Sequence, residues 1–239
     1  MKISALLLAK STSSFKHKNI MPLLGKPIMA FPMLAAINTG KIDSFYLSSD
    51  SQDYLNIARE YGYRGILRPG FLASSDAKSD DAVKHAYDTI EDIRTSDILI
   101  VQHANVATIY PGLINESIEL LINDASITSV VPAHVNYEYN PYRCFFQDGE
   151  NGLVPAMSDM YKMSPNRQEL PIPVFLDHSF WCIRTKNINK SFDFSPWNAL
   201  GNKIKPLVCQ GMFDIHDEED LRKSHDWIIN NKEKVSYLW

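Results

Sequence analysis

The sequence has little cysteine, no long apolar run and no excess of basic residues, and each shortage excludes a class of protein. Its cysteines, Cys144, Cys182 and Cys209, are widely spaced and form no CxxC pair, so neither a disulfide framework nor a zinc site is indicated. No apolar run approaches the length of a membrane span, and the first residues lack the pattern of a signal peptide. A formal net charge of −4 argues against a general nucleic-acid binder. We therefore expect a soluble cytoplasmic protein that binds small anionic molecules, with neither nucleic acid nor membrane as a partner.

Glycine is missing from the first loop, where many α/β enzymes hold a phosphate. Ile3 to Ala9 is a continuous run of small and apolar residues, typical of a strand buried on both faces of a parallel sheet. The loop that follows, "KSTSSFKHK", carries Lys10, Lys16 and Lys18 but no glycine, so close approach of the backbone to phosphate oxygens is harder. We expect the lysines and the hydroxyls of Ser11 to Ser14 to supply the phosphate contacts instead. The alternative is a basic loop that is simply solvated.

Strands and helices alternate along most of the chain. The expected strands are 3–9, 44–50, 97–102, 127–133 and 205–211, and the expected helices are 28–39, 50–62, 79–93, 111–123 and 217–231. In the first helix, Leu34 and Ile37 are expected to face the core. This alternation predicts an α/β fold with a doubly wound, mostly parallel sheet that binds ligands at the carboxyl ends of its strands. Between 137 and 184 the pattern becomes β-rich, so we expect one domain, 1–239, with an inserted lobe at about 137–184.

Several polar positions could carry chemistry, although each has a plainer explanation. Arg68 and Ser79 flank a helix start that could receive a nucleotide, whereas Ser79 could also be an ordinary helix cap. Asp214 is expected at the end of a strand, where a carboxylate could hold Mg²⁺ together with substrate phosphates. The acidic run 217–220 needs no function, because the helix dipole favours it. Arg167 in the lobe suits a substrate carboxylate, or is an ordinary surface arginine.

These pieces, in this order, resemble the CMP-sialic acid synthetase family of cytidylyltransferases, most of all its bacterial branches for legionaminic, pseudaminic and related nonulosonic acids. The resemblance is carried by "LLLAKSTSSFKHKN", "LLGKPIMAF", "YLSSDSQDYLNIAREYG", "LRPGFLASSDAKSDDAVKHA", "DILIVQ", "NPYRCF", "NRQELP" and "FDIHDEEDL". It implies a Rossmann-like fold with a small β-rich dimerisation lobe, and commonly a homodimer. It also implies a cytidylyltransferase that joins CTP to a keto sugar acid, giving a CMP-sugar and pyrophosphate for surface polysaccharide biosynthesis.

The resemblance further implies roles for individual residues. The expected catalytic residues are Lys10, Lys18 and Asp214. The expected nucleotide contacts are Ala9, Lys10, Ser11, Ser13, Lys18, Asn19, Arg68 and Ser79. The sugar acid is expected to contact Gln102, Arg143, Arg167, Gln168 and His178, with Arg167 on its carboxylate. The expected cofactor is Mg²⁺, or Mn²⁺ in its place, held by Asp214 and His216.

The sequence departs from the family's pattern at the site itself. The family's glycine-rich Ala-Arg-x-Gly-Ser-Lys-Gly loop is "AKSTSSF" here, and its second metal-binding aspartate is His216. Its "QPTSPLR" is "QHANVAT", and its Asn-Gly-Ala is His178-Ser179-Phe180. Two alternatives therefore stand beside an active cytidylyltransferase. One is a catalytically impaired protein that binds a nucleotide or sugar acid on the same fold, and the other is a nucleotidyltransferase that uses another nucleotide.

Overall fold

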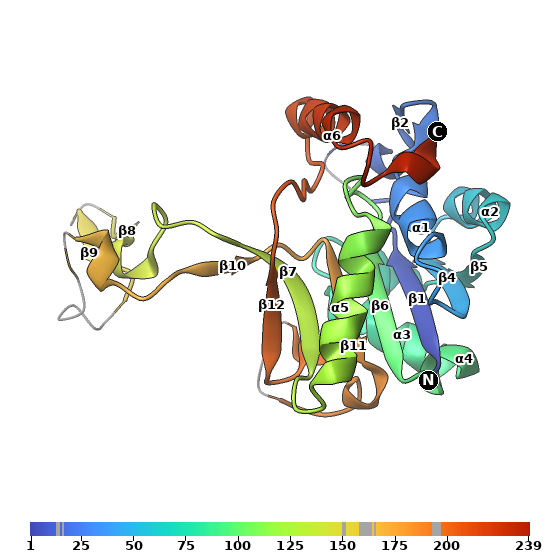
Figure 1. The fold of residues 1–239 in the computed structure, drawn as a ribbon, viewed down its shortest axis with the longest axis horizontal. Coiled ribbons are helices and arrows are strands. Elements are labelled where there is room, and N and C mark those ends of the chain that lie inside the picture. Colours follow the sequence, from blue (N-terminus) through green and yellow to red (C-terminus); the bar gives the residue numbers. More distant parts are fainter. Residues whose placement is uncertain (13–14, 16, 150–151, 158–163, 165, 193–196) are drawn as a thin grey trace.

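The computed structural model describes residues 1–239 except 13–14, 16, 150–151, 158–163, 165 and 193–196 (Figure 1). The helices are α1 Ala30–Ile37, α2 Gln52–Glu60, α3 Ser79–Thr89, α4 Glu91–Arg94, α5 Pro111–Asn123 and α6 Glu218–Asn230. The strands are β1 Ile3–Leu8, β2 Pro22–Leu23, β3 Lys26–Pro27, β4 Ser44–Ser49, β5 Arg64–Leu67, β6 Ile98–His103, β7 Ser129–Val135, β8 Phe145–Gln147, β9 Leu153–Pro155, β10 Val174–Leu176, β11 Phe180–Arg184 and β12 Ile204–Val208. Among the described residues, no helix is both long and apolar enough to cross a bilayer.

The main sheet has eight strands in the order β10-β7-β11-β6-β1-β4-β5, with β12 also paired to β7. Strand β1 is parallel to both of its neighbours, β4 and β6, and β5 is parallel to β4. Strands β10 and β11 run antiparallel to the strands beside them. The predicted α/β fold with a mostly parallel sheet is confirmed.

Helices cover both faces of this sheet, which is why β1 is apolar at nearly every position. On one face, Ile3, Ala5 and Leu7 pack into cores shared with α1, α2 and α5. On the other face, Leu6 and Leu8 pack into a core shared with α3 and α4. Because successive side chains of a strand point to opposite faces, only a continuous apolar run satisfies both cores.

Several local predictions need correction. Helix α5 matches the expected 111–123, but the expected helix 79–93 is interrupted at Ile90, which lies in an extended conformation between α3 and α4. Ile37 is 37% exposed, because α1 contacts the sheet through the small side chains of Ala35 and Ala36. Leu34 packs only at the edge of a core that includes α6.

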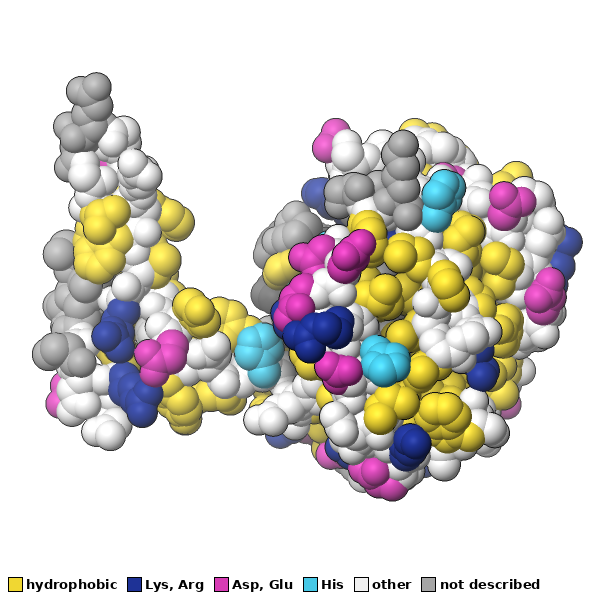
Figure 2. Space-filling view, turned by 90° about the horizontal axis from the view of Figure 1, so that it is seen from above, with side chains coloured by type: hydrophobic (Ala, Val, Ile, Leu, Met, Phe, Trp, Pro, Cys, Tyr) yellow, Lys and Arg dark blue, Asp and Glu magenta, His cyan; other side chains and the backbone are white. Residues whose placement is uncertain are grey.

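Between 136 and 173 the chain leaves the body and forms a long arm that carries the antiparallel β8–β9 hairpin (Figure 1). The arm stands clear of the body when the molecule is turned (Figure 2). It is shorter than the expected lobe of 137–184, because β10 and β11 return to the main sheet and pair with β7 and β6.

Candidate nucleotide-binding site

A cavity of about 600 Å³ opens at the carboxyl ends of β1, β5 and β6. Its walls are formed by Leu8, Lys10, Thr12, Lys18, Asn19, Arg68, Ser75, Ala77, Lys78, Ser79, His103, Asn105, Asp214 and His216. The chain proceeds from β1 to β4 on one side of the sheet and later adds β6 on the other, so this is the point where the strand order reverses. Ligands of doubly wound sheets bind at that point.

Basic side chains line the cavity. Lys10, Lys18, Arg68 and Lys78 all line it. Lys18 is only 8% exposed, and its Nζ donates a hydrogen bond to the Ile215 carbonyl over 2.6 Å. Burial lowers the pKa of Lys18, although Asp214 and Asp220 oppose that shift. Four cationic side chains around one cavity suit a polyanion such as a triphosphate.

Arg68 is held by hydrogen bonds to two backbone carbonyls, and one of its donors has no partner among the described residues. The residue is 6% exposed, and its Nη2 donates to the Ser48 carbonyl over 2.6 Å while Nη1 donates to the Leu72 carbonyl over 3.3 Å. Its Nε is shielded from solvent and has no hydrogen-bond partner among the described residues. Burial lowers the pKa of Arg68, with Asp50 opposing the shift. A held guanidinium with an unpaired donor is prepared for an anionic ligand.

The loop after β1 uses its hydroxyls differently from the prediction. The backbone N–H and the hydroxyl of Ser11 both donate to the Asp50 carboxylate, and the Thr12 hydroxyl donates to the Ala73 carbonyl. These hydroxyls therefore anchor the loop instead of facing a ligand, and Ser11 is not on the cavity wall. Of the other predicted contacts in this loop, Ser13, Ser14 and Lys16 lie outside the described residues.

Asn19 and Ser79, which were predicted to contact a nucleotide, both line the cavity. The Asn19 side-chain nitrogen donates to the Lys10 carbonyl over 3.2 Å, and its Oδ1 is shielded from solvent without a partner among the described residues. Ser79 is the first residue of α3 and not its cap, because Lys78 occupies the cap position. Ala9, by contrast, is 1% exposed, and its backbone N–H is used by the Ser48 carbonyl.

Asp214 and His216 also line the cavity, on either side of the Ile215 carbonyl that holds Lys18. Their closest carboxylate and imidazole atoms, Oδ2 and Nε2, are 3.2 Å apart, and the Asn105 side-chain nitrogen donates to the other carboxylate oxygen. Burial raises the pKa of Asp214, while His216 and Lys18 oppose that shift. Asp214 lies in the loop between β12 and α6 and not at a strand end, because β12 already ends at Val208.

As metal ligands, Asp214 and His216 fit a divalent cation only in part. Asp214 is the one carboxylate among the described residues that line the cavity, and those residues contain no group of three or more His, Cys, Asp or Glu side chains suited to a metal. Mg²⁺ often binds through one or two carboxylates plus substrate phosphates, so Asp214 suits it. The imidazole of His216 suits Mn²⁺ and other transition metals better than Mg²⁺.

Gln102 does not reach this cavity. It is fully buried, and its amide donates to the Pro32 carbonyl over 2.7 Å and lies 3.5 Å from the Tyr63 hydroxyl. Residue 102 points to the face of the sheet covered by α1, whereas the cavity opens on the side reached by its neighbour His103. The prediction that Gln102 contacts the sugar acid is therefore not supported by this geometry.

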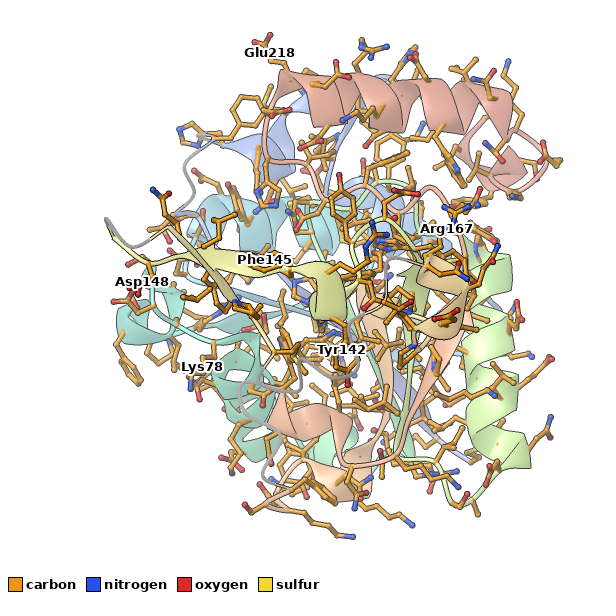
Figure 3. The ribbon with its side chains drawn as sticks, turned by 90° about the vertical axis from the view of Figure 1, so that its left-hand side faces the viewer. Lys78, Tyr142, Phe145, Asp148, Arg167 and Glu218 are labelled. Carbon is orange, nitrogen blue, oxygen red and sulfur yellow. The ribbon has the colours of Figure 1, made fainter. Side chains whose placement is uncertain are left out.

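The other residues predicted to bind the sugar acid also lie away from the cavity wall. Arg143, Arg167 and Gln168 are exposed on the arm, and Arg167 forms a 2.7 Å ion pair with Glu138. In Figure 3, which looks along the arm, Arg167 belongs to the arm, whereas Lys78 belongs to the body behind it. Within one chain, these residues and the basic cavity are not brought together.

His178 lies in the turn between β10 and β11, with a positive φ of 57°. Its Nδ1 accepts a hydrogen bond from the Trp181 indole over 3.1 Å, and its ring stacks on Trp197 at 4.4 Å. Burial lowers its pKa. The ring is therefore held by two tryptophans next to the cavity, without forming its wall.

The sequence analysis did not predict six of the cavity residues: Leu8, Ser75, Ala77, Lys78, His103 and Asn105. His103 ends β6 and Asn105 follows it, so both stand at the carboxyl end of a predicted parallel strand, where ligands bind. That rule could have identified them. Lys78 precedes α3 with no distinguishing pattern, and only the tertiary structure brings it beside Lys10 and Arg68.

Comparisons with known proteins agree with this geometry. The family model described as "Cytidylyltransferase" matches residues 5–170. The chain is 30% identical over 161 residues, or 66% of its length, to a Helicobacter pylori protein described as pseudaminic acid cytidylyltransferase and UDP-2,4-diacetamido-2,4,6-trideoxy-beta-L-altropyranose hydrolase; this match spans only 30% of that longer protein. It is 25% identical to the pseudaminic acid cytidylyltransferase of Campylobacter jejuni, over 86% of each chain. A solved CMP:2-keto-3-deoxy-manno-octonic acid synthetase complexed with CTP shares the fold, with a TM-score of 0.71 at 11% identity, covering 96% of this chain and 99% of the other.

Proposed function

The chain belongs to the cytidylyltransferase family, and from that premise we propose that it transfers a cytidylyl group from CTP to a keto sugar acid of the nonulosonic class, releasing pyrophosphate. The observation that carries this proposal is the cavity at the reversal of strand order, which is lined by four cationic side chains and by Asp214. The match to the Campylobacter enzyme over 86% of both chains supports the choice of acceptor.

The proposed reaction is an in-line displacement at the α-phosphorus of CTP. The anomeric hydroxyl oxygen of the sugar acid forms the new bond to phosphorus, and the bond from phosphorus to the oxygen bridging the α- and β-phosphates breaks. Pyrophosphate leaves with that electron pair, and the hydroxyl proton is released. Charge on the phosphates grows during this step, so Lys10, Lys18 and Arg68 would stabilise the transition state by fixed electrostatics.

Asp214 and His216 would hold a divalent cation, and Mg²⁺ or Mn²⁺ is the proposed ion. Bound there, it would offset negative charge on the phosphates. Lys18 would be held beside it, since its Nζ is anchored to the carbonyl of Ile215, next to Asp214. Asn105 would orient the Asp214 carboxylate through their hydrogen bond.

The binding site for the sugar acid would be completed by the arm of a second copy of the chain. Arg143, Arg167 and Gln168 stand on an arm that extends away from the body (Figure 1), and none of them lines the cavity, so a role at a cavity requires that the arm reach a partner's body. The arm also exposes apolar side chains, a pattern typical of a surface that another chain covers (Figure 2). The exposed apolar residues of the arm are Tyr137, Tyr139, Phe145, Phe146, Leu153, Val154, Met157 and Ile172.

The proposed activity is tested by incubating the protein with CTP, Mg²⁺ or Mn²⁺, and each of pseudaminic, legionaminic, sialic and Kdo-type acids. Pyrophosphate release with at least one acid is expected. Lys18→Ala should abolish most of it, whereas Lys84→Ala, at a surface lysine paired with Asp88, serves as the matched control. CTP binding without turnover with any acid would favour the impaired binding protein, and turnover with UTP or GTP but not CTP would favour another nucleotide.

The proposed dimer is tested by complementation. Lys18→Ala damages the cavity and Arg167→Ala damages the arm, so each variant alone should be inactive. If arms act on partner cavities, a mixed dimer has one intact cavity that receives one intact arm, and an equal mixture should recover about a quarter of the activity. Light scattering that gives a monomer mass, or a mixture that stays inactive, would contradict the proposal.

A further inference from the structure

His103 lines the cavity at the end of β6. It is the last residue of β6, it pairs in register with Leu8 at the end of β1, and both residues line the cavity. Its backbone N–H donates to the Ser179 carbonyl over 3.2 Å, which ties β6 to β11 at this level. The imidazole therefore projects from a strand that is paired with its neighbours, and the sheet determines its position.

The ring has unused hydrogen-bonding capacity. The Nε2 of His103 is shielded from solvent and has no hydrogen-bond partner among the described residues. Its orientation comes from packing instead, since the ring meets the edge of Trp181 with centroids 5.6 Å apart and planes at 65°. Most buried polar atoms in folded proteins have a partner, so an exception on a cavity wall indicates a group that a ligand completes.

The ring is uncharged at neutral pH. Burial, and then the neighbouring His178 and Arg68, lower the pKa of His103 to about 4. A neutral imidazole offers one N–H donor and one acceptor nitrogen. The charged groups around the cavity, four cations and Asp214, serve phosphates, a carboxylate or a metal ion. The neutral imidazole of His103 suits a different kind of ligand group, one that can both donate and accept a hydrogen bond. A hydroxyl is such a group.

We propose that His103 binds a hydroxyl group of a substrate through a ring nitrogen and so determines which substrate the cavity accepts. The inference rests on the proposed function, because both of its substrates carry hydroxyls. The hydroxyl comes from one of two sources, the ribose of CTP or the keto sugar acid. A phosphate cannot replace it as a donor at neutral pH, because its oxygens are ionised.

The experiment compares His103→Phe, which keeps an aromatic ring against Trp181, with His103→Gln, which restores a donor and an acceptor. His225→Phe is the control, at a histidine of α6 that pairs with the exposed Asp226. Thermal melting first establishes that each variant is folded. Calorimetry then measures binding of CTP, 2′-deoxy-CTP, 3′-deoxy-CTP and UTP, and steady-state kinetics measure KM for the acid that the wild-type protein uses.

We expect His103→Phe to weaken one substrate about 5- to 100-fold, the range for leaving a buried hydroxyl unpaired, and His103→Gln to recover part of that loss. If the ribose is the source, the affinity for CTP falls, and the variant no longer distinguishes CTP from the deoxy analogue that lacks the bound hydroxyl. If the sugar acid is the source, CTP binding is unchanged and KM for the acid rises.

Two results would overturn the assignment. Binding of CTP and KM for the acid both within twofold of wild type in His103→Phe would show that the ring only packs. A loss confined to the preference for CTP over UTP would assign the ring to the cytosine amine instead of a hydroxyl. If the wild-type protein binds CTP but turns over no acid, the proposed function fails, while the ribose arm still tests His103 through binding alone.

Discussion

Asp177 and His103 should give the stability of this protein two opposing pH dependences over nearly the same range. Burial raises the pKa of Asp177 from 3.8 to about 6, even though Ser179 and His134 oppose the shift. Below about pH 4 this residue is protonated in both folded and unfolded states, so it costs nothing. As the pH rises towards 6, the unfolded chain ionises first, and the folded state is destabilised. At 1.36 kcal/mol per pKa unit, the upper limit of this loss is about 3 kcal/mol.

His103 acts in the other direction. Its pKa falls from 6.5 to about 4 because the ring is buried. Above about pH 6.5 it is neutral in both states, and as the pH falls the unfolded chain takes up the proton first. Stability is therefore lost between about pH 6.5 and pH 4, again by up to about 3 kcal/mol. In the wild-type protein the two contributions nearly cancel, so single variants are needed to reveal them.

Asp177→Asn removes the ionisation while keeping a similar shape. Urea unfolding between about pH 4 and pH 7 gives the free energy of unfolding of the variant minus that of wild type. This difference should rise by about 2–3 kcal/mol as the pH increases, whereas His103→Phe minus wild type should fall by a similar amount. Any constant offset due to repacking drops out, since it does not vary with pH. Flat difference curves for both variants would refute the reasoning.

Three further variants test individual residues. Gln102→Leu should cost about 1–3 kcal/mol of stability, because the Pro32 carbonyl loses its buried donor, while KM for the sugar acid stays unchanged; a raised KM at full stability would return Gln102 to the site. Lys18→Ala should weaken CTP binding in calorimetry about 10- to 100-fold, as expected for a charged hydrogen-bond donor, and unchanged binding would remove it from the phosphate site. His216→Asp should raise the affinity for Mg²⁺ relative to Mn²⁺, measured by titration with CTP present, because it replaces nitrogen by oxygen; an unchanged ratio would mean that residue 216 does not contact the ion.

The sequence by itself determined the α/β class of the fold, the positions of most helices and the region of the site. These follow from local patterns: the continuous apolar run of β1 requires burial on both faces, and the helical spacing of 111–123 reappears unchanged as α5. Ordered motifs also identified Lys10, Lys18, Arg68 and other cavity residues, since a site at strand ends is built from segments whose order the chain preserves.

Only the tertiary structure decided which side chains are free to meet a ligand. The hydroxyl of Ser11 is used by Asp50, which lies 39 positions away, and Gln102 is used by Pro32, 70 positions away. Such pairings depend on which acceptor the fold places nearby, and residue spacing carries no record of that. The same holds for His103, because the lack of a partner for its Nε2 depends on how the neighbouring strands and helices pack around the ring. The sequence located the cavity, but long-range packing selected the atoms that face it.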